Sequence, residues 1–136
     1  MTYREAINLG EKVLNMADVA DAKIDAWLLL EMVCKIDRSF YYLHMEDEVA
    51  EEQLSEYEIA LRKRAEHVPL QYIVGEAEFM GLKFKVNSNV LIPRQDTETL
   101  VEEALKVVKP GMKVLDLCTG SGCIIVSIVH NVPEVE

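Results

Sequence analysis

The residues best suited to chemistry lie in a glycine-rich segment near the carboxyl end of the sequence. Its order is Asp116-Leu117-Cys118-Thr119-Gly120-Ser121-Gly122, between an apolar run at 114–117 and an apolar stretch at 122–130. Glycines let a backbone pass close beneath a ligand, and a helix start offers N–H donors without intrahelical partners. A strand, this turn and a helix, in that order, predict a nucleotide-binding turn at the carboxyl end of a sheet.

Three classes of ligand compete for such a turn. A P-loop would end in Gly-Lys-Ser or Gly-Lys-Thr, and that ending does not follow here. A dinucleotide-binding turn would want a small residue where Ile125 stands, so that helix and strand can pack closely. The remaining class is S-adenosylmethionine, and a glycine-rich turn without any ligand stays as the structural alternative.

The segment resembles motif I of the Rossmann-like methyltransferases, an acidic residue followed by alternating glycines. The resemblance implies S-adenosylmethionine as cofactor, with Asp116 beside its methionine end and supporting the loop. It implies these cofactor-binding residues: Asp116, Cys118, Thr119, Gly120, Ser121 and Gly122. Cys118 stands where the motif has its first glycine, and we expect the turn to tolerate it if the backbone there does not need a positive φ.

Three upstream segments, at 69–75, 78–81 and 90–98, resemble the release factor glutamine methyltransferases in order and spacing. This resemblance implies methyl transfer to the side-chain amide of a glutamine in peptide chain release factors, which would be the protein partners. It also places part of the third segment near the cofactor pocket, through Pro93, Arg94, Thr97 and Glu98. For Arg94, Asp96 and Glu98 the alternative is a capped helix start with solvated charges.

That family transfers the methyl group with an Asn-Pro-Pro-Tyr motif, which this sequence does not contain. The acidic residue expected to bind the cofactor's ribose would also fall beyond Glu136. We therefore expect the 136 residues to be an N-terminal portion of the enzyme, without catalytic residues and without transfer activity of its own. Two alternatives stay open: a DNA adenine amino-methyltransferase, and a non-catalytic module that only binds a release factor.

Helical spacing dominates the first half of the sequence. Thr2 and Glu5 form a capping box, which predicts a helix from Tyr3 to Met16. Asp21 can cap a second helix, for which an apolar stripe is expected at Ile24, Leu28, Met32 and Ile36, widened by Trp27 and Leu29. A short helix at 39–45 and a longer one that opens in the acidic run 46–52 follow. The longer helix ends in the basic run 62–64, which reads as a dipole-matched, solvated surface.

The pattern changes at Pro69 to alternation punctuated by glycine, which predicts a hairpin around Gly81. Asp96 or Thr97 can cap the next helix, with an apolar stripe expected at Leu100, Val101, Ala104, Leu105 and Val108. A strand at 114–117 and a helix at 122–130 complete the sequence-based elements. The expected fold is thus a helical bundle for substrate recognition at 1–72, a β-hairpin linker at 73–95, and the first elements of a truncated α/β Rossmann-like methyltransferase domain at 96–136.

Composition excludes several classes of protein. Lys and Arg number 14 against 24 Asp and Glu, and the net charge of −10 opposes binding to a phosphate backbone. Neither a signal sequence nor a membrane-length apolar run is present, so a cytoplasmic protein is expected. No metal site is expected, because the three histidines lie apart and the three cysteines form no Cys-x-x-Cys pair.

Overall fold

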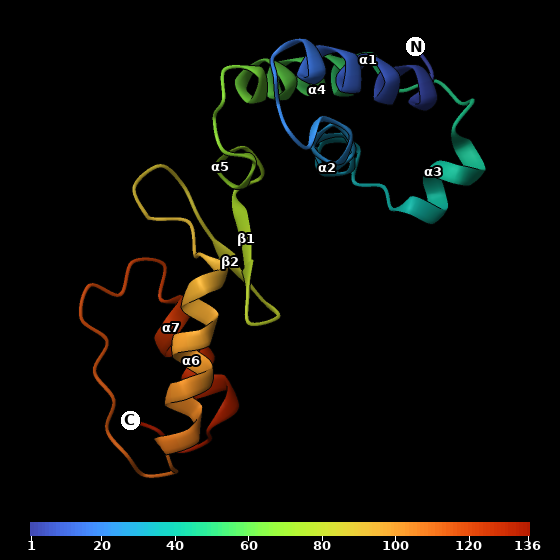
Figure 1. The fold of residues 1–136 in the computed structure, drawn as a ribbon. Coiled ribbons are helices and arrows are strands. Elements are labelled where there is room, and N and C mark those ends of the chain that lie inside the picture. The colour runs from blue at the N-terminus through green and yellow to red at the C-terminus, as the bar shows by residue number, and fades with distance from the viewer. The chain divides into compact units, whose positions relative to one another are not determined.

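The computed structural model describes residues 1–136, which form two compact units, Met1–Val74 and Gly75–Glu136 (Figure 1). Each unit has its own cluster of buried apolar side chains. The first unit contains five helices: α1 (Tyr3–Met16), α2 (Ala22–Cys34), α3 (Arg38–His44), α4 (Glu51–Ala65) and α5 (Leu70–Val74). The second contains β1 (Glu76–Phe79), β2 (Leu82–Lys85), α6 (Gln95–Val107) and α7 (Cys123–Asn131). Most of the chain is therefore helical, with one two-stranded sheet.

Local sequence sets the start of α1. The Thr2 hydroxyl accepts the N–H of Glu5 at 3.2 Å, and the Glu5 carboxylate accepts the N–H of Thr2 at 2.9 Å. The predicted capping box and the predicted helix bounds are both confirmed. The N–H of Tyr3, which has no partner within the helix, donates to the carbonyl of Asp47 at 3.1 Å. The loop between α3 and α4 thus completes the cap.

The predicted apolar stripe of α2 is wrong in part. Ile24 is 55% exposed, and Ile36 lies beyond the helix, which ends at Cys34. The buried apolar residues are Ala22, Ala26, Trp27, Leu29, Leu30 and Cys34. Steps of four residues overshoot one helical turn by about 40°, so a strict fourfold repeat drifts off one face. With apolar residues almost all around α2, its packing against α1 and α4 selects the buried face.

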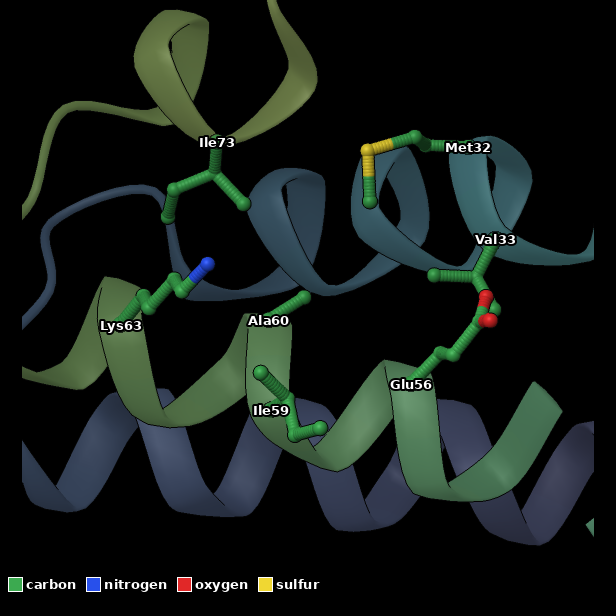
Figure 2. Close-up of a pocket in the computed structure, with 7 residues that line it drawn as sticks. All are labelled: Met32, Val33, Glu56, Ile59, Ala60, Lys63 and Ile73. Carbon is green, nitrogen blue, oxygen red and sulfur yellow. The ribbon is translucent and has the colours of Figure 1, made fainter. Parts of the chain in front are cut away.

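Helix α5 was not predicted from the sequence. Pro69 does separate it from α4, as expected of a helix-breaking residue, and its carbonyl then accepts the N–H of Tyr72 at 3.0 Å. Ile73 of α5 lies over a pocket of about 180 Å³ between α2, α4 and α5 (Figure 2). The pocket is lined by Met32, Val33, Glu56, Ile59, Ala60, Lys63 and Ile73. These contacts make the short helix part of the first unit.

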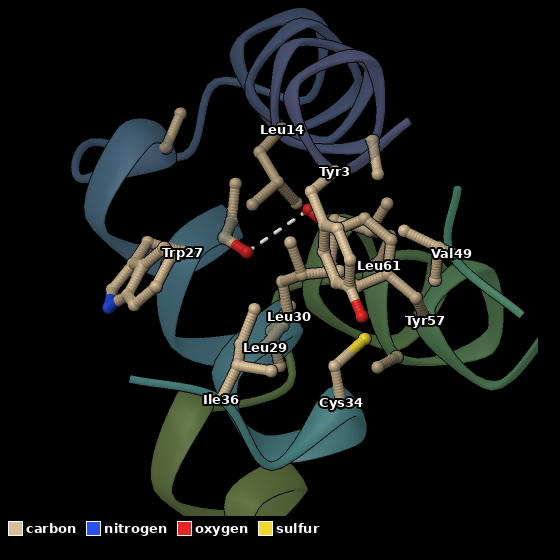
Figure 3. Close-up of a cluster of buried hydrophobic side chains, with 14 of the residues drawn as sticks. Tyr3, Leu14, Trp27, Leu29, Leu30, Cys34, Ile36, Val49, Tyr57 and Leu61 are labelled. Carbon is tan, nitrogen blue, oxygen red and sulfur yellow. Dashed lines mark hydrogen bonds between the residues drawn. The ribbon is translucent and has the colours of Figure 1, made fainter. Parts of the chain in front are cut away.

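The core of the first unit is built around Tyr57 of α4, which is 1% exposed (Figure 3). Its hydroxyl donates to the carbonyl of Ala26 in α2 at 3.0 Å. Gly10 of α1 faces the same ring, and a Cβ added there would lie 2.1 Å from the Tyr57 hydroxyl oxygen. The absence of a side chain at Gly10 therefore permits the close approach of α1 to the tyrosine.

A partly buried ion pair crosses the first unit. Arg64 Nε donates to Asp25 Oδ2 at 2.7 Å, and the two side chains are 19% and 7% exposed. Arg64 also donates to the carbonyl of Val68 at 3.2 Å, in the loop before α5. The basic end of α4 is thus not simply a solvated surface, because one of its three cations joins α4 to α2 and to that loop.

The second unit begins with an antiparallel hairpin in which Ala77 pairs with Phe84 and Phe79 pairs with Leu82. Only Met80 and Gly81 separate the strands, with φ values of +50° and +72°. Two positive values in a two-residue turn match the right-handed twist of the strands. The predicted turn at Gly81 is confirmed.

The N-cap of α6 lies two to three residues before the predicted caps. Arg94 is its N-cap and makes no side-chain cap, so neither Asp96 nor Thr97 has that role. Val101 is fully buried, but Leu100 of the predicted stripe is 57% exposed. The buried face of α6 is consequently narrower than the pattern of apolar residues predicts.

The predicted strand at 114–117 is not formed, and Leu115 and Leu117 are 81% and 77% exposed. A strand needs a hydrogen-bonded neighbour, and only a first step of pairing is present. The N–H of Glu136 donates to the carbonyl of Met112 at 3.0 Å, while the N–H of Val114 donates to the carbonyl of Glu136 at 2.8 Å. Glu136 thus bonds to the residue before Lys113 and to the residue after it, which is the hydrogen-bond pattern of parallel strands.

Candidate functional site

The glycine-rich turn leads directly into α7. Gly122 is the N-cap residue of α7, with φ of +81°, and its carbonyl accepts the N–H of Val126 at 3.0 Å. Its own N–H donates to the carbonyl of Thr119 at 2.9 Å, which closes the turn. The first N–H groups of a helix have no intrahelical partners and carry partial positive charge. The turn therefore ends at a set of donors suited to a polar or anionic ligand group.

Asp116 and Thr119 meet on one side of the turn. The Thr119 hydroxyl donates to Asp116 Oδ2 at 2.9 Å. Asp116 is half-buried and Thr119 is exposed. Because an ionised carboxylate has four lone-pair sites, this bond leaves Asp116 able to accept from a ligand as well.

Cys118 has a positive φ, so the condition under which we expect the turn to tolerate a cysteine in place of glycine is not met. Its φ is +61°, in the left-handed region where a Cβ is unfavourable. The side chain is exposed, so no packing offsets the strain. The turn keeps the conformation that a glycine would favour, although a cysteine occupies the position.

Gly120 is required by its backbone conformation and not by lack of space. Its φ is +59°, while a Cβ added there would come no closer than 4.0 Å to the carbonyl oxygen of Cys118. A β-branched residue at such a φ is a genuine outlier. The space above Gly120 is open to a ligand.

Ser121 supplies a polar atom without a partner in the same turn. Its hydroxyl oxygen is buried and makes no hydrogen bond within the structure. Buried polar atoms are nearly always paired, so an orphan in a glycine-rich turn fits a site where a bound molecule supplies the partner. The hydroxyl group, the helix donors and the Asp116 carboxylate are together consistent with the polar methionine end of S-adenosylmethionine.

Residues 93–98 bond within the first turn of α6 and to the hairpin turn, and their place near a cofactor pocket stays a prediction. Arg94 is exposed, and its carbonyl accepts the N–H of Thr97 at 3.0 Å in the first turn of α6. Pro93 and Thr97 are half-buried. Glu98 does not face solvent alone: its Oε1 accepts the N–H of Met80 at 2.7 Å. No hydrogen bond or ion pair joins residues 93–98 to residues 118–122.

Two contacts in the structure were not predicted from the sequence. The bond from Met80 to Glu98 spans 18 residues, and the pair of Asp25 with Arg64 spans 39, so local patterns do not reveal either. A weak signal existed for Asp25, which is the one acid in the first turn of α2 and is followed by the apolar residues 26–30. A carboxylate on a buried face needs a cationic partner, and only the fold identifies which one.

Titration behaviour is perturbed in the core of the first unit. Burial raises the pKa of Tyr57, with a further increase from Cys34. Burial also raises the pKa of the Cys34 thiol, and Glu56 adds to that increase. These groups are held neutral inside the bundle, which suits a structural role.

The structure contains neither a cluster of metal ligands nor a membrane-spanning helix. No three His, Cys, Asp or Glu side chains come together in a group that could hold a metal ion. None of the helices has both the length and the apolar character needed to cross a membrane.

Comparison with known proteins gives a consistent result. The family described as PrmC N-terminal domain matches residues 5–75. Proteins named release factor glutamine methyltransferase match nearly the whole chain. The protein from Geobacter sulfurreducens is 36% identical over 99% of the chain and 48% of its own length. Those from Moorella thermoacetica and Clostridium acetobutylicum are 38% and 43% identical, over 98% and 100% of the chain and 48% of their own lengths. The chain spans about half the length of the curated relatives it matches.

Proposed function

The chain belongs to the family of release factor glutamine methyltransferases, and on that premise we propose that it forms the cofactor-binding turn and the substrate-recognition unit of such an enzyme. The proposed reaction transfers a methyl group from S-adenosylmethionine to the side-chain amide nitrogen of a release factor glutamine. The observation that carries the proposal is the turn at 116–122. It combines two left-handed glycines, a carboxylate and an unpartnered buried hydroxyl at the start of α7.

The proposed roles follow from the chemistry of each residue in the turn. Asp116 would face the ammonium group of the cofactor, because a carboxylate pairs most strongly with a cation. Ser121 and the first N–H groups of α7 would take the carboxylate of the cofactor's amino acid part. Gly120 would let the ligand lie against the backbone. When bound, S-adenosylmethionine would supply an electrophilic methyl group on a sulfonium.

The pairing of Glu136 with the backbone around Lys113 supports a Rossmann-like arrangement for this part of the chain. Parallel strands need a crossover connection, usually a helix, and α7 lies between the two paired segments. In sheets of that kind ligands bind at the carboxyl ends of the strands, where the turn 116–122 lies in sequence. We therefore propose the order strand, turn, α7, strand for residues 113–136.

For the unit Met1–Val74 we propose binding of the release factor. All residues of its hydrophobic core come from within the unit, so the unit can present a fixed surface without contacts from the rest of the chain. Its acidic character disfavours DNA as the substrate, since binding to nucleic acid depends on clustered cations. Residues 1–66 carry 15 acids and 8 bases, a net charge of −7.

A methyl-transfer assay tests the proposal. Residues 1–136 replace the matching half of the Clostridium acetobutylicum relative, and the chimera receives methyl-labelled S-adenosylmethionine with either a release factor or adenine-containing DNA. The proposal predicts label on a glutamine of the release factor. Label on adenine alone, or no label from a chimera that circular dichroism shows to be folded, would contradict it.

A further inference from the structure

Glu98 connects two parts of the second unit. Its Oε1 accepts the N–H of Met80 at 2.7 Å, and the pair is partly buried. Met80 lies in the hairpin turn with φ of +50°, a strained conformation for a residue with a side chain. Glu98 lies in the first turn of α6. The hydrogen bond therefore joins a strained turn to the start of a helix.

Apolar packing continues from this bond toward the glycine-rich turn. Phe79 of the hairpin, Val101 of α6 and Cys123 of α7 belong to one buried cluster. Val101 follows Glu98 by three residues, so both lie on neighbouring positions of the same helix face. Cys123 is the residue directly after the turn. Helix α6 is thus held at two neighbouring positions of one face.

The carboxylate is suited to this bond. Hydrogen bonds to an ionised acceptor are about twice as strong as neutral ones. The first turn of α6 contains a second acid, Asp96, which is exposed. The N–H of Met80 in the hairpin turn donates to Glu98 and not to Asp96. This oxygen of Glu98 is used within the protein, which separates its role from that of a cofactor ligand.

We propose that Glu98 is a positioning residue that holds α6 on the hairpin turn and so sets the position of the start of α7 and of the glycine-rich turn. Its importance for cofactor binding rests on the proposed function. The positioning itself concerns only contacts within residues 76–131, and it can be tested without any cofactor.

Amide hydrogen exchange followed by NMR in the 136-residue chain is the test. In Glu98→Ala the N–H of Met80 should exchange about 10- to 100-fold faster, the effect of losing a hydrogen bond to a charged group. The N–H of Gly122, which closes the glycine-rich turn, should also exchange faster, by about 2- to 30-fold, as for mutations that act through a network. Glu98→Gln should restore most of the protection at both sites, because its amide oxygen still accepts.

The matched control is Asp96→Asn, which removes a charge from the same helical turn without touching the hairpin bond, and should change neither rate. An unchanged exchange rate at Met80 in Glu98→Ala would show that the hydrogen bond to Glu98 does not protect this N–H. An unchanged rate at Gly122 would show that Glu98 does not position the glycine-rich turn. A Glu98→Gln variant as fast as Glu98→Ala would also contradict the proposal. Adding S-adenosylmethionine to the same samples tests the proposed function separately: shifts of the amide signals at 118–123 support it. Their absence would weigh against cofactor binding by this chain and leave the exchange result as it stands.

Discussion

Replacing Gly10 by alanine tests the packing of the first unit, because two effects of opposite sign compete. On helix propensity alone, Gly→Ala inside α1 would stabilise the protein by about 1 kcal/mol. The added Cβ, however, would lie 2.1 Å from the hydroxyl oxygen and 3.0 Å from Cζ of Tyr57, and 3.1 Å from Cβ of Ala26. Ordinary contacts are about 3.5 to 4.0 Å, so the tyrosine must move by more than an ångström.

Moving Tyr57 has two costs. Overpacking a dense core costs about 1 to 3 kcal/mol. The hydroxyl, which now donates to Ala26 at 3.0 Å, would lose its partner at a buried position, at a further cost of about 1 to 3 kcal/mol. After the gain in helix propensity, Gly10→Ala should lower the free energy of unfolding by about 1 to 5 kcal/mol.

Urea unfolding followed by tryptophan fluorescence measures this change in the whole chain. The chain has a single tryptophan, Trp27, which is buried in the first unit, so the signal reports that unit. Tyr57→Phe provides the control, because it removes the atom nearest to the added methyl. Gly10→Ala should cost clearly less in the Tyr57→Phe background than in the wild type. Equal costs in both backgrounds, or a Gly10→Ala variant more stable than the wild type, would refute the reasoning.

Three further predictions concern single groups. Cys118→Gly should stabilise the second unit by about 1 kcal/mol, because it removes left-handed strain; slower amide exchange at 118–123 would register the gain, and faster exchange would contradict it. Asp25→Ala should destabilise the first unit by about 1 to 3 kcal/mol in urea unfolding, since it leaves the partly buried Arg64 with the Val68 carbonyl but without its charged partner, and no measurable change would show that water replaces the carboxylate. Burial raises the pKa of Cys34 and of Tyr57, so the folded state holds these protons more tightly than the unfolded state. The resulting stability is complete below the ordinary pKa values, about 8.5 and 10, and should fall as the pH rises through the raised ones; Tyr57→Phe should lessen the fall above pH 10.

Local rules accounted for the elements whose causes lie within a few residues. Thr2 and Glu5 bond to each other, so their spacing alone located the start of α1. Gly81 located the hairpin turn because positive φ strongly favours glycine. The position of α7 also followed from its apolar run. In each case the energy that selects the structure is short-range in sequence.

Long-range selection accounts for the features that the sequence did not predict. Which face of α2 is buried depends on where α1 and α4 pack, and the exposure of Ile24 follows from that choice. The predicted strand at 114–117 requires a neighbouring strand, and only Glu136 pairs with it. The hydrogen bond from Met80 to Glu98 was not predicted, because its two residues lie 18 positions apart, while the place of Glu98 near a cofactor pocket stays a prediction.

The turn itself illustrates both cases. The spacing of Gly120 and Gly122 predicted a glycine-rich turn before a helix, and both glycines have positive φ. Cys118 also has a positive φ, and the motif did not predict this. Unlike a glycine, a cysteine gives no sign in the sequence that the backbone is left-handed. The assignment of S-adenosylmethionine to this turn stays a prediction.

The most direct test of the account is the affinity of S-adenosylmethionine for the chimera with the Clostridium acetobutylicum relative, measured by calorimetry for the unsubstituted protein, Gly120→Ala and Gly120→Val. If the cofactor lies against the backbone at Gly120, the Gly120→Val dissociation constant should rise at least about tenfold, since a branched side chain both strains the turn and fills the ligand's space. The dissociation constant of Gly120→Ala, which adds strain without a branched side chain, should lie between those of the unsubstituted protein and Gly120→Val. Equal affinity for all three proteins would contradict the placement of the cofactor at residues 116–122.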